Sequence, residues 1–243
     1  MDYGLQLFSV RDFTDKDLYG TLQKVAAMGY KFVEFAGFFG HSDVEIKAML
    51  NMTALKASGT HSGTAGLLPE NIDESIRFHK GIGCENYIIP GDDLSTKEKL
   101  DRFIEIVNAA QPKLLANGIK LHYHNHSHEF FPNADGLYIH EELEKRTNIL
   151  FEIDTFWAFN AGKDPVEMLE RLKDRVEIIH LKDGFKGGEG KSLGQGEAPV
   201  LAVLQKAKEL GLTVVVESEG LDPNGLEESK RCIDFLKSLR GIF

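Results

Sequence analysis

The sequence contains 243 residues, of which 42% are hydrophobic, and its formal net charge is −10. This apolar fraction is enough for a sizeable core, and no basic stripe stands out. Proteins that bind nucleic acid independently of its sequence need clustered lysine and arginine, so we expect no nucleic acid partner.

The N-terminal residues and the two cysteines indicate the cellular compartment in which the protein works. The opening stretch MDYGLQLFSVRD has acidic residues at Asp2 and Asp12 and no long apolar segment, so we expect neither a signal peptide nor a membrane partner. Cys84 and Cys232 lie far apart in unrelated contexts, which indicates two free thiols in a reducing compartment. We therefore expect a cytoplasmic protein.

The first half of the chain alternates between short strand-like runs and helical segments. Gly29 is expected to stop the first long helix, Pro69 to open the third, and Pro112 to kink or break the fourth. The expected strands are 3–10, 31–36, 55–61 and 86–89, and the expected helices are 14–28, 42–50, 69–81 and 95–118.

The second half repeats the alternation and adds one long glycine-rich loop, Gly184 to Gly196. That loop is too long to be a simple connection, and we expect it to be mobile and to cover an active site. The expected strands are 119–124, 149–154, 176–182 and 213–217, and the expected helices are 137–146, 164–173, 199–210 and 226–239.

Eight strands that alternate with eight helices predict an α/β fold with parallel strand pairing. Eight such units close into a single (β/α)8 TIM barrel, for which 243 residues is a typical size. We expect one domain over residues 1–243, because no linker stands out. An open doubly wound sheet is the alternative, but LFSVRDF after the first strand lacks the glycine-rich phosphate loop of that fold.

Side chains that bind metals follow several of the expected strands. Asp154 ends one apolar run, His180 and Lys182 end the next, and Glu217 ends the one after. In this barrel the active site lies where strands run into the following loops. Carboxylates and imidazoles delivered there predict a divalent-metal enzyme site. Further candidates at the same end are Gln6, Ser9, Arg11, Glu34, His61, His124 and His126.

The stretch KLHYHNHSHEF is ambiguous. His122, His124 and His126 alternate, so on a strand they share one face, and only one or two need to touch a metal. A separate surface metal site made of these histidines is an alternative. Single residues also have structural explanations: Glu34 could pair with Lys31 in solvent, and a lone histidine is often a core residue.

Seven motifs occur in one order along the chain. They are LQLFSVRD, MGYKFVEFAGFFG, YHNHSHEF, FEIDTFWAFNAGKDPVEML, IIHLKD, LGQGEAP and VVVESE. With them the chain resembles the xylose isomerase-like TIM-barrel superfamily, in its sugar phosphate isomerase/epimerase branch, over nearly its whole length.

The resemblance implies one divalent metal, with manganese expected first and Mg, Co, Zn or Fe as alternatives. It places Asp154, His180 and Glu217 as ligands. Many relatives supply a glutamate as the first ligand, where this chain has YHNH. His124 is therefore the expected first ligand, with His122 or His126 as alternatives. This departure argues against a symmetric two-glutamate proton exchange.

The resemblance further implies an isomerase or epimerase that acts on a keto-sugar or sugar phosphate through an enediolate. Glu217 is the expected base and Lys182 an electrophile or acid. Trp157 with Phe38 is expected to wall the sugar ring, and Glu34, His61 and His126 to bind hydroxyls. The alternatives are a dehydratase or keto-glycoside lyase and a non-catalytic sugar-binding barrel. The expected partner is a small carbohydrate, and a homo-oligomer is left open.

Overall fold

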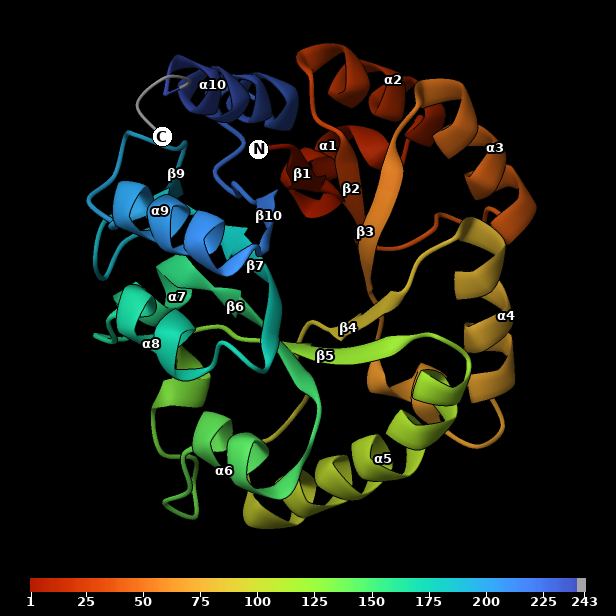
Figure 1. Cartoon of the computed structure of the whole chain (residues 1–243), viewed down its shortest axis with the longest axis vertical. Coiled ribbons are helices and arrows are strands. Elements are labelled where there is room, and N and C mark those ends of the chain that lie inside the picture. Colours follow the sequence, from red (N-terminus) through yellow and green to blue (C-terminus); the bar gives the residue numbers. More distant parts are fainter. Residues whose placement is uncertain (240–243) are drawn as a thin grey trace.

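The protein, represented by a computed structural model that describes residues 1–239, is a closed barrel of eight parallel strands (Figure 1). Around the barrel the strands follow the chain order, and β1 closes it by pairing with β10. The prediction of a single (β/α)8 TIM barrel is confirmed. The barrel strands are β1 Tyr3–Gln6, β2 Phe32–Phe35, β3 Lys56–His61, β4 Asn86–Ile89, β5 Lys120–His124, β6 Leu150–Asp154, β7 Val176–Leu181 and β10 Thr213–Val216.

Helices lie between successive strands and form the outer ring that Figure 1 shows. The long ones are α2 Leu18–Met28, α3 Asp43–Thr53, α4 Ile72–Ile82, α5 Lys97–Ala116, α6 Ile139–Arg146, α8 Pro165–Arg171, α9 Val200–Leu210 and α10 Gly225–Ser238. Short helical turns follow several strand ends: η1 Leu7–Val10, α1 Arg11–Thr14, η2 Thr64–Leu67, η3 His128–Phe130 and α7 Thr155–Asn160.

Local sequence signals fix several helix ends where they were expected. Ser42 and Glu45 form a capping box at the start of α3, in which each side chain satisfies a backbone N–H of the other residue. Gly29 ends α2 with φ of 105°, a left-handed conformation that suits glycine. Gly211 ends α9 in the same way.

Other expectations were wrong in detail. The first strand stops at Gln6, because the Gln6 side chain accepts a hydrogen bond from Phe8 N and starts η1. Pro112 does not break α5, whose buried face, including Val107 and Leu114, continues on both sides of it, whereas a kink there stays a prediction. Pro69 lies three residues before α4, in the turn that leads into that helix.

The barrel interior holds a small apolar layer with polar side chains above it. Ile88, Ile178 and Val215 form a buried cluster separate from the main core between barrel and helices. Side chains two residues apart on a strand share a face, so His180 follows Ile178, and Glu217 follows Val215, toward the carboxyl end of the barrel. Charged and imidazole groups therefore replace hydrocarbon in the upper layers.

The glycine-rich loop contains a small antiparallel hairpin, β8 Asp183–Gly184 with β9 Gly190–Lys191. The buried Asp183 carboxylate accepts hydrogen bonds from the backbone N–H groups of Gly184, Gly194, Gly196 and Ala198, at 2.8 to 3.2 Å. This carboxylate ties the loop to the end of β7. Closure of the loop over a substrate stays a prediction.

The loop is also held near its tip. Gly187 N donates to Asn160 Oδ1 of α7 over 2.7 Å. At Gly190 an added Cβ would lie 3.2 Å from Lys182 Cε, so the hairpin backbone packs closely on that lysine. A Cβ at this position would require the Lys182 side chain or the hairpin to shift by a few tenths of an ångström.

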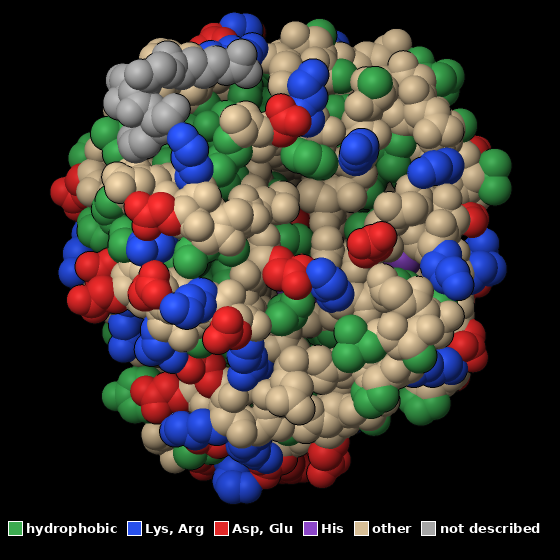
Figure 2. Space-filling view, in the orientation of Figure 1, with side chains coloured by type: hydrophobic (Ala, Val, Ile, Leu, Met, Phe, Trp, Pro, Cys, Tyr) green, Lys and Arg blue, Asp and Glu red, His purple; other side chains and the backbone are tan. Residues whose placement is uncertain are grey.

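On the face in Figure 2, lysine, arginine and acidic side chains are intermingled, and those drawn in colour form no continuous basic stripe. No helix within residues 1–239 is both long and apolar enough to cross a membrane.

We expect Asp183→Asn to loosen the hairpin. The amide nitrogen of asparagine donates hydrogen bonds, so it cannot accept from the two backbone N–H groups that the replaced oxygen now binds. Hydrogen bonds to a charged group contribute about 1.5–3 kcal/mol. Amide hydrogen exchange of Gly194 and Gly196 should accelerate roughly 10- to 100-fold. The exposed Asp174, changed to Asn, is the matched control. Unchanged exchange in Asp183→Asn would show that this carboxylate does not hold the loop.

Candidate active site

Four consecutive strands around the barrel, β5, β6, β7 and β10, each deliver one candidate ligand to the same end. The parallel pairing sets His180 of β7 opposite Asp154 of β6. Glu217 directly follows β10, and its N–H bonds to the carbonyl of Leu181 at the end of β7. His124 is the last residue of β5. Strand pairing therefore brings together residues almost a hundred positions apart.

His124, Asp154, His180 and Glu217 form a compact buried set, here called the upper cluster. One donor atom of each lies within 4.8 Å of the others. Asp154 Oδ1 caps α7 by accepting from Trp157 N over 2.8 Å, whereas Oδ2 has no hydrogen-bond partner. His180 Nδ1 is also without one and lies 3.4 Å from Glu217 Oε2.

These unpartnered atoms fit a bound divalent cation. A buried polar atom without a partner costs free energy. Two imidazoles and two carboxylates from four strands are a donor set that Mn, Fe, Co or Zn accepts. The same donor set suits each of these metals.

The second nitrogen of His180 lies in a layer beneath, here called the lower cluster and made of Glu34, His61, Glu152 and His180. His180 Nε2 is 2.7 Å from Glu34 Oε1 and 3.2 Å from Glu152 Oε2. Nε2, bonded to carboxylates, carries a proton, so Nδ1 is the nitrogen open to a metal. Burial lowers the pKa of His180, but Glu152, Glu34 and Glu217 raise it well above its ordinary value, so a metal would bind Nδ1 by displacing its proton. The lower cluster therefore orients His180 and sets its tautomer.

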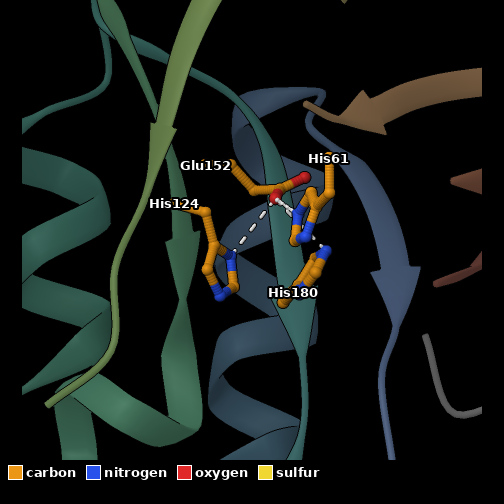
Figure 3. Close-up of side chains that lie close together, drawn as sticks. All are labelled: His61, His124, Glu152 and His180. Carbon is orange, nitrogen blue, oxygen red and sulfur yellow. Dashed lines mark hydrogen bonds and ion pairs between the residues drawn. The ribbon is translucent and has the colours of Figure 1, made fainter. Parts of the chain in front are cut away.

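Glu152 is the centre of the lower cluster, and Figure 3 shows three imidazole rings turned toward its carboxylate. Its Oε2 is 3.0 Å from His61 Nε2 and 3.2 Å from His124 Nδ1. Glu34 lies alongside, with its Oε1 2.6 Å from Gln6 Nε2 and 3.1 Å from His61 Nε2. Both glutamates are fully buried.

The charges of the lower cluster are strongly coupled. Burial, and then the neighbouring Glu34 carboxylate, raise the pKa of Glu152 to about 8. Burial opposes ionisation of Glu34 too, but His180 and His61 hold its pKa well below the ordinary value. Burial lowers the pKa of His61, but the charge of Glu34 raises it more, to about 9. One carboxylate of the pair is thus ionised and the other tends to keep its proton.

The upper cluster separates its two carboxylates in the same manner. Burial raises the pKa of Asp154 to about 7, although Lys182 opposes this. Burial also acts on Glu217, but the charges of Lys182 and His180 hold its pKa below the ordinary value. Glu217 is therefore an anion at neutral pH.

Lys182 is a buried cation beside the upper cluster. Its Nζ lies 2.5 Å from Glu219 Oε2, 3.4 Å from Glu217 Oε2 and 4.5 Å from the centre of the Trp157 ring. Burial lowers its pKa, but Glu217 and Asp154 reverse the effect, so the net shift is upward. Lys182 is therefore charged, and the indole face supplies a further cation–π contact.

Two side-chain amides hold the loops around the site. Asn125 bonds both backbone groups of Asp154, accepting from its N–H over 3.1 Å and donating to its carbonyl over 3.2 Å. Asn160 donates to Ser127 Oγ, which donates to the Trp157 carbonyl. These hydrogen bonds join the loop after β5 to Asp154 and helix α7.

A cavity of about 410 Å³ opens beside the lower cluster and is lined by His61, Phe38, Phe78 and Tyr87, among others. The side chain of His61 is partly exposed there. Through His61 this cavity borders the lower cluster.

The structure separates the three histidines that the sequence left open. His124 joins the upper cluster. His122 is fully buried with its Nε2 3.0 Å from Asn86 Oδ1, and burial lowers its pKa to about 3. His126 is half-buried, with its ring 6.0 Å from that of Trp157. Of the YHNH histidines, the geometry favours His124 as the ligand.

Sequence reasoning missed Glu152 and Glu219. Glu152 had a signal, because in FEID it lies two residues before Asp154 and so shares its face of β6. Glu219 lies in the loop after β10, where no periodicity marks a side chain that pairs with a lysine on another strand.

Comparison with known proteins agrees with this architecture. A family model described as xylose isomerase-like TIM barrel matches residues 22–239. A sugar phosphate isomerase/epimerase from Parabacteroides distasonis, known from its crystal structure, superposes with a TM-score of 0.85 and 24% identity over 97% of each chain. At that identity the likeness shows the fold.

Two curated relatives are enzymes. The 2-oxo-tetronate isomerase of Haemophilus influenzae is 25% identical over 237 residues, which cover 85% of this chain and 89% of the relative. The inosose dehydratase of Geobacillus kaustophilus is 23% identical over 186 residues, which cover 67% of this chain and 60% of the relative. With the family model spanning most of the barrel, the chain belongs to the xylose isomerase-like TIM-barrel family.

Proposed function

We propose that the protein is a metal-dependent isomerase or epimerase that acts on a keto-sugar through an enediolate. The observation that carries the proposal is the upper cluster, four buried ligand-type side chains whose donor atoms lie within 4.8 Å of one another, with Asp154 Oδ2 and His180 Nδ1 lacking a hydrogen-bond partner. The names of the curated relatives suggest 2-oxo-tetronate and inosose as the first substrates to try. A cytoplasmic location and a possible homo-oligomer stay predictions.

The metal would be held by His124, Asp154, His180 and Glu217, with manganese as the first metal to test. When bound, a divalent cation would supply Lewis acidity to carbonyl and hydroxyl oxygens and so acidify the carbon next to the carbonyl. Glu34 and Glu152 support this arrangement through the imidazoles of His180 and His124.

Glu217 is the proposed base. Its lowered pKa keeps the carboxylate ionised, so it can accept a proton from the substrate carbon. The same charges make it a weak base, and removal of the proton therefore depends on acidification of that carbon. Lys182, held against Glu217 and Glu219, is placed to stabilise an oxyanion or to return a proton from Nζ.

The substrate would lie against Trp157 and the partly exposed His61, with His126 within reach of hydroxyls. His61 ends β3, with its ring 4.9 Å from that of His124, His126 lies in the loop after β5, and Trp157 lies in α7 after β6. Glu34 was expected to bind hydroxyls as well. Because it is fully buried and engaged by Gln6, His61 and His180, we now favour a role in orienting His180.

A dehydratase is the second candidate, and the similarity to inosose dehydratase favours it. It would use the same donor set and the same proton removal, and would then expel hydroxide from the next carbon. Product analysis separates the two: an isomerase conserves the substrate formula, and a dehydratase releases one water per turnover.

Asp154→Asn should bind one equivalent of Mn²⁺ fewer per chain than wild type, because it removes a carboxylate ligand from the upper cluster. Metal analysis after reconstitution and dialysis measures this. Asp164→Asn is the control, since asparagine also caps α8 at that exposed position. Equal metal content in wild type and Asp154→Asn would refute the proposed centre.

Glu34→Gln should weaken Mn²⁺ binding roughly 10- to 100-fold, the range found when partners of metal-bound histidines are changed. An amide donor facing His180 Nε2 favours the tautomer with the proton on Nδ1, which cannot bind metal. Calorimetric titration with Mn²⁺ measures the affinity. Glu45→Gln keeps the exposed capping box of α3 and serves as the control. Unaltered affinity in Glu34→Gln would exclude this orienting role.

Glu217→Gln, at saturating metal, should lose about 10²- to 10⁴-fold in exchange of the substrate C–H with solvent deuterium, the usual range for a general base. Nuclear magnetic resonance of 2-oxo-tetronate or inosose in D₂O follows the exchange. Lys182→Met tests the second proton carrier, and exposed Glu227→Gln is the control. Exchange at the wild-type rate in metal-loaded Glu217→Gln would mean that another group is the base.

A further inference from the structure

A third group of metal-type side chains lies outside both clusters. His126, His128 and Glu129 follow β5 in the loop and the short helix η3, and one donor atom of each lies within 4.8 Å of the others. None of the three belongs to the upper or lower cluster. The proposed reaction uses His126 only to contact substrate hydroxyls, so this group needs its own explanation.

Glu129 is the unusual member of the group. Its side chain is 0% exposed, yet within residues 1–239 the one ion pair recorded for it is with His128. Tyr123 Oη donates to Oε1 over 2.9 Å, and His126 N donates to Oε2 over 2.9 Å. These neutral donors supply no full positive charge, and a buried carboxylate needs one.

The spacing suits a cation between Glu129 and His128. Their atoms Oε1 and Nε2 are 3.2 Å apart. Two ligands each about 2.1 Å from a tetrahedral metal ion lie roughly 3.4 Å from one another. A carboxylate has about four lone-pair positions, of which two are used here, so Glu129 has acceptor capacity left for a metal.

The two histidines are arranged to complete such a site. Their rings are stacked at 5.9 Å with an angle of 20° between the planes. The His128 side chain is 59% exposed, so it is free to rotate the short distance needed to close on an ion. Within residues 1–239 neither imidazole has a hydrogen-bond partner apart from the ion pair of His128 with Glu129.

We infer that His126, His128 and Glu129 bind a second divalent transition-metal ion, with water in the remaining positions. Two imidazoles and one carboxylate suit Zn²⁺ and its neighbours better than Mg²⁺ or Ca²⁺, which prefer oxygen ligands. The ion neutralises Glu129 and cross-links the loop that directly follows His124. It lies beside Trp157, whose ring neighbours that of His126.

The test is titration of the metal-free protein with Zn²⁺, read as ions bound per chain by calorimetry and by metal analysis after dialysis. The variants are His128→Asn, which changes an exposed side chain, and Glu129→Gln, which keeps the shape of the buried one. The partly exposed His41, changed to Asn, controls for surface histidine. Asp154→Asn removes the ion expected in the upper cluster, so that the remaining ions bound per chain belong to other sites.

We expect two ions in wild type and in His41→Asn, and one in His128→Asn, Glu129→Gln and Asp154→Asn. One ion in wild type and none in His128→Asn would support the site in this loop. The same result would refute the metal site proposed for the upper cluster. Equal numbers of bound Zn²⁺ ions in wild type and His128→Asn would overturn the inference, because His128 would then hold no ion.

Discussion

Four buried carboxylates share one end of the barrel with three side chains that carry positive charge. The structure of the site depends on how these cations compensate the carboxylate charges. Glu34, Glu152, Asp154 and Glu217 are all buried there, against His61, His180 and Lys182 as cations. The pKa values of Glu152 and Asp154 rise to about 8 and about 7, chiefly through burial, with a neighbouring carboxylate adding to the rise. A divalent cation in the upper cluster would relieve this shortage of positive charge.

His180 connects the two layers of this charge system. Its Nε2 lies against Glu34 and Glu152, and its Nδ1 faces Glu217. Protonation of one nitrogen and metal binding by the other are thus set by carboxylates on different strands. A barrel favours this arrangement, because inward-facing residues stack in layers and alternate strands contribute the side chains of each layer.

Periodicity and local signals predicted all eight barrel strands and the helices between them, and they brought Asp154, His180 and Glu217 to one end. They could not predict contacts made by side chains across the barrel. The Gln6 amide starts a helical turn and binds Glu34, so the first strand is shorter than its apolar pattern suggests. Asp183 gathers backbone N–H groups from residues up to fifteen positions away, which a local pattern cannot reveal.

The central claim is that the metal lies in the upper cluster, among His124, Asp154, His180 and Glu217. Anomalous diffraction from crystals soaked in Mn²⁺ tests it most directly. The account predicts one strong peak inside the barrel, about 2.0–2.3 Å from His180 Nδ1 and from the nearest carboxylate oxygens of Asp154 and Glu217. A peak between Glu34, His61 and Glu152 instead, or no peak within the barrel, would contradict it.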